Sequence, residues 1–175
     1  MKILIASDLH GNLPGARFIV SKALKEGCDL VALLGDLIHC GLRSDTFDGL
    51  LAAKILSSLT IPVVSVRGNC DSDSDLAEFP WFTPESAWLF LDQLFLLCHG
   101  HQMRQIEQSF EGFFNLISGH THVPMADNGP RGRRWNPGSL GLPEWNYPPS
   151  YGLYHDGVFR VMSLTDEVIC EDRLN

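Results

Sequence analysis

The chain has 175 residues, of which 45% are hydrophobic and 19% charged, and its formal net charge is −8 at pH 7. This composition excludes disordered and fibrous proteins, and the length predicts one domain over residues 1–175. The acidic balance argues against a long nucleic acid partner, because such binding rests on Lys and Arg contacts to phosphates. No apolar run approaches the roughly 20 residues that span a bilayer, and no secretory signal pattern is present, so we expect no membrane association.

The first half alternates short apolar runs with amphipathic segments. We predict strands at residues 2–7, 30–34 and 61–66, and helices at 13–26 and 47–59. Gly27 is a typical stop signal for the first helix. Strands that are joined by helices in this way predict a parallel arrangement.

The second half is richer in strands. We predict a hairpin of strands 86–91 and 94–98, a short helix at 102–111, and strands near 113–118, 122–126, 132–136, 151–155 and 158–163. Asp156-Gly157 is a strong hairpin signal between the last two strands. The Pro- and Gly-rich stretch 137–149 predicts a loop. This order favours an α/β protein with two sheets packed face to face and helices outside.

Five of the apolar runs end in side chains that can bind metal ions. The clusters are Asp8-Leu9-His10, Gly35-Asp36, Gly68-Asn69-Cys70-Asp71, His99-Gly100-His101 and Gly119-His120-Thr121-His122. Open α/β sheets place their ligand crevice at the carboxyl ends of strands. In an extended chain, residues i and i+2 point to the same side, so Asp8 should project with His10, and His120 with His122.

The number of candidate ligands predicts two metal ions. The candidates are Asp8, His10, Asp36, Asn69, His99, His120 and His122. A single tetrahedral site needs about four ligands, whereas two ions that share one carboxylate use all of these residues. Carboxylate and imidazole ligands without thiolates suit Mn²⁺, Zn²⁺ or Fe²⁺. Two-metal sites, with the ions about 3.5–4 Å apart, occur in phosphatases and nucleases.

The ordered motifs Asp-x-His, Gly-Asp, Gly-Asn-x-Asp, His-Gly-His and Gly-His-x-His resemble those of the calcineurin-like metallophosphoesterases, and the resemblance runs from Lys2 to about Val161. Gly68-Asn69-Cys70-Asp71 and Asn136-Pro137-Gly138-Ser139 resemble the small YfcE-type phosphodiesterases. The resemblance implies a four-layer α-β-β-α sandwich of two mixed sheets, with a dinuclear metal site at the strand ends. It also implies a phosphodiesterase that hydrolyses small phosphodiesters.

The resemblance assigns roles to the candidate ligands by position. Asp8, His10 and His122 would bind the first metal ion, Asn69, His99 and His120 the second, and Asp36 would bridge both. A hydroxide between the ions would attack the phosphorus in line. Mn²⁺ is the expected metal, and Zn²⁺, Fe²⁺ or Ni²⁺ are alternatives.

Cys70 departs from the wider superfamily, in which many members carry a His after the Gly-Asn pair that assists the leaving group. A thiol with a pKa near 8.5 is a weak hydrogen-bond donor. We therefore expect a minor catalytic contribution from Cys70 and a preference for good leaving groups such as aryl oxides.

Two other functions stay open. One is a non-catalytic, Vps29-like protein-interaction module, for which ligand positions should be missing; all are filled here. The other is a phosphomonoesterase or nucleotidase. A nuclease is disfavoured by the acidic charge. Homo-oligomers could form through an edge strand or the aromatic segment 79–84.

Several residues have more than one interpretation. His101 and Asp71 could support ligands from behind, and Trp145 or Tyr147 could stack on a substrate. The cluster Arg131, Arg133 and Arg134 is interpreted as a solvated hairpin. The five cysteines form no Cys-x-x-Cys motif, which predicts reduced thiols, with Cys28 and Cys98 in the core, and a cytoplasmic location.

Overall fold

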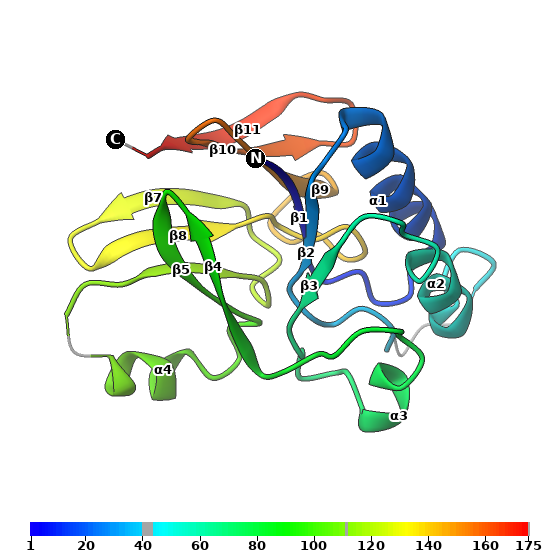
Figure 1. Cartoon of the computed structure of the whole chain (residues 1–175). Coiled ribbons are helices and arrows are strands. Elements are labelled where there is room, and N and C mark those ends of the chain that lie inside the picture. Colours follow the sequence, from blue (N-terminus) through cyan, green and yellow to red (C-terminus); the bar gives the residue numbers. More distant parts are fainter. Residues whose placement is uncertain (40–43, 111, 175) are drawn as a thin grey trace.

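The computed structural model describes residues 1–39, 44–110 and 112–174, which form two β-sheets and four helices (Figure 1). The strands are β1 (Lys2–Ala6), β2 (Leu30–Leu33), β3 (Val63–Ser65), β4 (Ser86–Leu91), β5 (Gln93–Cys98), β6 (Asn115–Ser118), β7 (Met125–Gly129), β8 (Gly132–Asn136), β9 (Ser150–His155), β10 (Val158–Ser163) and β11 (Val168–Arg173). The helices are α1 (Leu13–Glu26), α2 (Gly49–Leu56), α3 (Asp73–Leu76) and α4 (Met103–Ser109).

Both sheets are mixed. The six-stranded sheet has the order β11-β10-β9-β1-β2-β3, with β1, β2 and β3 parallel and β9 antiparallel to β1. The five-stranded sheet has the order β4-β5-β6-β8-β7, with β5, β6 and β8 parallel. The parallel strands of each sheet end at one edge, which is where their connecting loops carry the polar clusters.

Three hydrophobic clusters separate four layers. Leu4 and Leu33 of the six-stranded sheet pack against Ile19 of α1 and Leu56 of α2. A second cluster fills the space between the sheets and includes Ile5, Phe95, Ile117 and Trp135. A third, with Leu96, Phe114 and Leu116, packs on the far face of the five-stranded sheet against Ile106 of α4. Figure 1 shows α1 and α2 on one side and α4 on the other, so the predicted α-β-β-α sandwich is confirmed.

Helix α1 follows its sequence signals. The Asn12 side chain caps the first turn by accepting a hydrogen bond from the Gly15 N–H at 2.7 Å. Gly27 ends the helix with a φ of 62°, a conformation that glycine adopts without steric cost. The predicted helix and its stop signal are therefore confirmed.

Some predicted boundaries shift, and some elements were not predicted. Strand β7 begins at Met125, because the preceding segment is turned, and the acidic stretch after Asp71 contains α3, which a capping box between Ser72 and Asp75 stabilises. Strand β11 has no counterpart among the predicted strands. Its sequence Val-Ile-Cys-Glu-Asp-Arg is half polar, as expected for an edge strand. The predicted thiol at Cys40 and the predicted helix end at residue 111 lie outside the described residues.

The prediction of a solvated hairpin is wrong for Arg133. Its side chain is only 6% exposed and pairs with Asp172 of β11 at 2.9 Å, across the two sheets. The indole N–H of Trp135 donates to the same carboxylate at 2.8 Å. The basic cluster is thus divided, because Arg133 points inward while Arg131 lies at the surface near Glu107.

The described cysteines, Cys28, Cys70, Cys98 and Cys170, are free thiols, and the prediction that Cys28 and Cys98 are buried is confirmed. Within residues 1–39, 44–110 and 112–174, no helix has the length and apolar character needed to cross a membrane.

Candidate metal centre

The loops that follow β1, β2, β3, β5 and β6 meet at one edge of the sandwich. Backbone hydrogen bonds tie neighbouring loops together: the His10 N–H donates to the Asp36 carbonyl at 2.9 Å, and the Gly119 N–H donates to the His99 carbonyl at 2.9 Å. The His99 ring joins the two sheets, since its Nδ1 lies 2.7 Å from the Leu34 carbonyl. Residues far apart in the sequence therefore form one cluster, as expected for the carboxyl ends of parallel strands.

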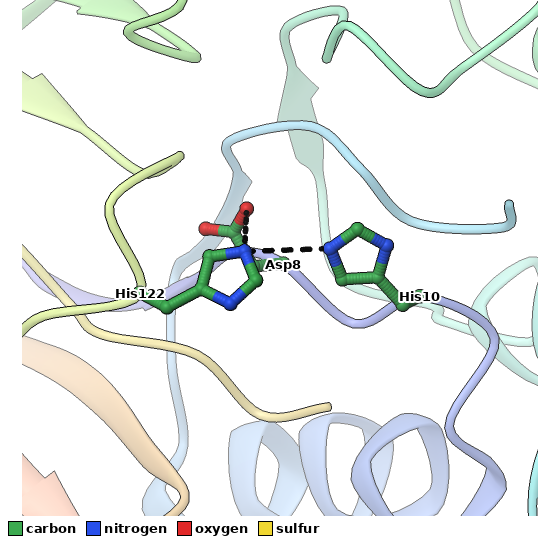
Figure 2. A group of neighbouring side chains, drawn as sticks. All are labelled: Asp8, His10 and His122. Atoms are coloured by element: carbon green, nitrogen blue, oxygen red, sulfur yellow. Dashed lines mark hydrogen bonds and ion pairs between the residues drawn. The ribbon is translucent and has the colours of Figure 1, made fainter. Parts of the chain in front are cut away.

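Asp8, His10 and His122 form one half of this cluster (Figure 2). The Nε2 atom of His122 lies 3.2 Å from Asp8 Oδ1 and 3.4 Å from Nε2 of His10. Figure 2 shows one nitrogen of each imidazole ring pointing toward the other ring, with the carboxylate beside them. These atoms are close enough to share one ion.

Asp36, Asn69 and His99 form the other half. The Nε2 atom of His99 lies 3.1 Å from Asn69 Oδ1 and 3.3 Å from Asp36 Oδ2. The same Asp36 oxygen lies 3.8 Å from Nε2 of His10. Asp36 therefore stands between the two halves, next to one imidazole from each.

Hydrogen bonds orient three of the imidazoles toward the carboxylates. The Nδ1 atoms of His10, His99 and His122 each meet a backbone carbonyl, those of His39, Leu34 and Leu142. When Nδ1 carries the proton and donates it to a carbonyl, the Nε2 lone pair is free to bind a metal ion. Metal-binding histidines usually make such a hydrogen bond with their second ring nitrogen.

Asp8 provides a direct test of whether a cation fits. Its carboxylate is fully buried, and Oδ1 has no hydrogen-bond partner in the part of the chain described. Burying a carboxylate oxygen without a partner costs free energy. Asp8 Oδ1 faces the Nε2 atoms of His122 and His99 at 3.2 and 3.8 Å. Converging acceptor atoms of this kind are satisfied by a divalent cation, so the residues fit such an ion.

The rings of His120 and His122 meet different partners, although the i, i+2 spacing predicted that they would project together. His122 faces Asp8, whereas the His120 ring stacks edge-on against His99 at a centroid distance of 5.1 Å. The reason is that this segment is not extended: His120 and His122 have φ angles of 67° and 58°.

The backbone of the cluster is strained. Asp8, His10 and Asp36 also have positive φ angles, of 53°, 50° and 52°. Left-handed conformations are unfavourable for residues other than glycine and concentrate at functional sites. Asp8 and His10 therefore meet through tight turns, not through the extended geometry that the spacing suggested.

Two glycines let the loops approach each other. A Cβ atom at Gly68 would lie 2.1 Å from Asp36 Oδ1, and one at Gly119 would lie 1.8 Å from Ser7 Oγ. Only glycine fits at these two positions, so their place beside the candidate ligands has a steric cause.

The charges of the cluster perturb its pKa values. Burial raises the pKa of Asp36, but the hydrogen bond and charge of His99 outweigh it and hold that pKa below its usual range. Burial lowers the pKa of His99, yet Asp36 and Asp8 raise it overall. The contact with Asp8 raises the pKa of His122, while burial and the charge of His99 lower that of His120.

Cys70 lies beside this cluster as a neutral thiol. Burial and the neighbouring Asp36 raise the pKa of its thiol to about 12. Its backbone N–H donates to Asp36 Oδ1 at 2.8 Å, and its sulfur accepts a hydrogen bond from the Asn69 amide at 3.2 Å. His101 lies farther out, with its ring 5.6 Å from that of His99 and its buried Nδ1 without a partner among the described residues.

Sequence reasoning attached no role to Asn136 and Ser139 beyond a motif resemblance. The Asn136 amide donates to the Gly119 carbonyl and to Thr121 Oγ1, which holds the turn that carries His120 and His122. Ser139 Oγ donates to the Asp8 carbonyl at 2.7 Å and accepts from the Leu142 N–H at 2.8 Å. The Asn-Pro-Gly-Ser sequence was the available signal, because such residues form side-chain-bonded turns.

Residues 1–156 match the calcineurin-like phosphoesterase superfamily domain. The chain belongs to this superfamily. It is therefore a calcineurin-like phosphoesterase, a family that works with divalent metal ions. Over 97% of the chain it is 34% identical to Phosphodiesterase YfcE of Escherichia coli K12, of which the match covers 95%.

Solved structures agree with the calcineurin-like fold. A structure of the E. coli phosphoesterase YfcE superposes with a TM-score of 0.87 at 29% identity, with full coverage of both chains. Vps29 of Entamoeba histolytica, crystallised in complex with Zn²⁺, superposes with a TM-score of 0.64 at 22% identity, over 99% of this chain and 98% of that one. The second likeness concerns the fold alone.

Proposed function

We propose that this phosphoesterase hydrolyses small phosphodiesters at the cluster of loops after β1, β2, β3, β5 and β6. Asp8, His10 and His122 would hold one divalent ion, Asn69, His99 and His120 would hold a second, and Asp36 would serve both. The observation that carries this proposal is the position of Asp36 Oδ2, which lies 3.8 Å from Nε2 of His10 and 3.3 Å from Nε2 of His99. One carboxylate oxygen beside two separate imidazoles suits a shared ligand.

Some side chains of the candidate metal centre supply charge, and others would contact the substrate. When bound, the divalent ions polarise the phosphoryl oxygens and lower the pKa of water, which supplies the nucleophile. Asp8 and Asp36 provide the buried negative charge that attracts the cations. Asn69 and His120 lie exposed at the mouth of the cluster, where a phosphate group arrives. The neutral thiol of Cys70 is a weak donor to a departing oxygen.

Mn²⁺ is our proposed metal, with Zn²⁺, Fe²⁺ or Ni²⁺ as alternatives. The candidate ligands are carboxylate, amide and imidazole groups. Such ligands suit Mn²⁺, whereas thiolate ligands favour softer metal ions. The single domain over residues 1–175, the cytoplasmic location and the homo-oligomer stay predictions.

A non-catalytic interaction module is the second candidate, because Vps29 proteins share the fold. The complete set of candidate ligands favours the enzyme. The substrates of a phosphomonoesterase and of a phosphodiesterase differ in the number of ester bonds and in charge, so the assay and not the ligand set separates the two activities.

The test is hydrolysis of bis-p-nitrophenyl phosphate and p-nitrophenyl phosphate by metal-stripped protein to which Mn²⁺, Zn²⁺, Fe²⁺ or Mg²⁺ is returned. We expect metal-restored turnover, with the diester preferred, and a loss of at least about 100-fold in the Asn69→Ala variant. Asn128→Ala, at an exposed position of β7, is the matched control and keeps full activity. Folded protein that turns over neither ester with any metal contradicts the proposal and favours the interaction module.

A further inference from the structure

A pocket of about 460 Å³ opens beside the candidate metal centre. His120 and His122, both candidate ligands, line it together with Met125, Glu144 and Trp145. This volume is within the range of small-molecule sites. A group that enters the pocket is therefore in contact with the same histidines that face the reacting phosphate.

Trp145 stands at the tip of a tight turn. The Tyr147 N–H donates to the Glu144 carbonyl at 3.1 Å, and the two residues between them, Trp145 and Asn146, have φ angles of 51° and 64°. Two successive left-handed residues other than glycine are unfavourable and persist only where the surroundings hold them. The turn nevertheless carries an indole that is 78% exposed, so core packing does not explain its presence.

The turn is attached to the metal centre through short hydrogen bonds. The His122 ring donates from Nδ1 to the Leu142 carbonyl, three residues before Trp145. Ser139 Oγ accepts from the Leu142 N–H at 2.8 Å and donates to the Asp8 carbonyl at 2.7 Å. The backbone three residues before Trp145 is thus held in place relative to both Asp8 and His122.

The chemistry of the pocket selects among possible occupants. Val123, Met125 and Trp145 offer apolar or aromatic surface, and the residues described around the pocket include the carboxylate of Glu144 but neither Lys nor Arg. A second phosphate would be repelled there, because like charges that approach closely disfavour binding. A flat uncharged ring finds a stacking partner in the indole.

We propose that this pocket binds an aromatic substituent of the phosphodiester, such as a nucleobase or an aryl ring, through stacking on Trp145, and that Glu144 excludes substrates with a further phosphate. This inference rests on the proposed function and names its substrate class. Trp145 is then a specificity-determining residue, and the preferred substrate is a phosphodiester of a nucleoside or aryl alcohol.

The test compares two diesters with the same leaving group, thymidine 5′-(p-nitrophenyl phosphate) and methyl p-nitrophenyl phosphate. We expect Trp145→Ala to raise KM for the thymidine ester by about 5- to 100-fold and to leave the methyl ester within about twofold, as loss of one stacking contact predicts. Trp145→Phe retains most of the preference. Phe82→Ala, which removes an aromatic ring that is 85% exposed elsewhere on the surface, is the matched control and changes neither KM.

A second arm tests Glu144. Adding a 3′-phosphate to the thymidine ester introduces the extra negative charge. We expect the wild-type protein to discriminate against this substrate and Glu144→Gln to reduce that discrimination several-fold. Unchanged discrimination in Glu144→Gln overturns the assignment of Glu144.

The outcomes separate this inference from the proposed function. Turnover of the methyl ester by the wild-type protein supports the function, and an unchanged ratio of the two KM values in Trp145→Ala then overturns the inference alone. If no ester is turned over, calorimetric binding of thymidine 5′-monophosphate in the presence of Mn²⁺ decides. Weaker binding by Trp145→Ala supports the pocket, and equal binding, or none by the wild type, overturns it.

Discussion

The carboxylate of Asp71 accepts a hydrogen bond from the backbone N–H of Asp36 at 2.7 Å, across 35 residues of sequence. The same buried side chain accepts from the N–H groups of Leu37 and Gly68, each at 2.9 Å. Burial raises the pKa of Asp71, and these backbone donors oppose that rise. One carboxylate therefore ties the loop of Asp36 to the loop of Asn69, so both candidate ligands depend on a residue that lies behind them.

Replacement of Asp71 by Asn should disturb both loops. The amide of Asn keeps one acceptor oxygen and replaces the other by an NH₂ group, which faces backbone N–H groups that also donate, so at least one of the three buried donors loses its partner. We expect the free energy of unfolding to fall by about 2–4 kcal/mol and the phosphodiesterase turnover to fall about 10- to 100-fold. Urea denaturation and kinetics at varied Mn²⁺ concentration measure the two effects.

Asp73→Asn is the matched control for Asp71, because its side chain is 91% exposed and its ion pair among the described residues is a surface pair with Arg67. We expect it to retain the stability and turnover of the wild-type protein. An Asp71→Asn variant that binds Mn²⁺ and unfolds as the wild-type protein does would refute the positioning role.

Cys70 should limit the range of leaving groups. Its raised thiol pKa keeps it neutral and a weak donor, so it gives little help to a departing alkoxide. We expect Cys70→His to raise kcat/KM for dialkyl phosphates by about 100-fold, the lower end of the usual contribution of a positioned acid, while bis-p-nitrophenyl phosphate changes little. Cys70→Ser controls for loss of the sulfur, and equal rates on dialkyl esters in all three proteins would count against this role.

The ion pair between Arg133 and Asp172 should stabilise the packing of the two sheets. Asp172 is 11% exposed, and its removal leaves a buried guanidinium and the Trp135 N–H without their acceptor. We expect Asp172→Ala to lower the free energy of unfolding by about 3–5 kcal/mol in urea denaturation. Glu171, on the same strand as Asp172, forms surface pairs with Arg160 of β10 and with Arg173, so Glu171→Ala should leave the free energy of unfolding nearly unchanged. Equal stability of the two variants would contradict the role of the ion pair.

The pair of Lys22 and Asp166 should make stability depend on pH. The ammonium of Lys22 lies 2.6 Å from Asp166 and holds the pKa of that carboxyl below its usual value. Burial lowers the pKa of Lys22, but Asp166 and Glu26 raise it above the ordinary range. Because the carboxyl pKa is depressed on folding, its contribution is present above about pH 4 and is lost as the pH falls through the folded value. The Lys22 contribution is present at neutral pH and is lost only above about pH 10.4.

Asp166→Asn tests this dependence. Asn tolerates the left-handed backbone at this position, where φ is 64°. The loss at pH 7 should be about 1 kcal/mol, since Asp166 is half exposed and solvent screens the pair. Urea denaturation should show the difference shrinking below pH 4. Asp156→Asn, which has a similar backbone and a more exposed side chain, is the control. A difference that does not vary between pH 3 and 7 would exclude the ion pair as its cause.

The sequence predicted those features that depend on neighbouring residues. Alternation of apolar runs and amphipathic segments predicted β1, α1, β2 and their parallel arrangement, and Asn12 and Gly27 mark the helix ends because caps are local. The types and order of the candidate ligands also came from the sequence, since each follows a buried strand whose carboxyl end it must occupy.

Tertiary structure decided the features that depend on distant partners. The half-polar β11 is recognisable only through the acceptor that Asp172 provides to Arg133 and Trp135, which lie 39 and 37 residues away. Similarly, Ser139 donates to the Asp8 carbonyl across 131 residues, and this contact brings the turn of Trp145 to the metal centre. Periodicity records whether a residue faces the core or solvent, but not which buried partner it meets. That choice is made when the two sheets pack and every buried polar group must find a hydrogen bond.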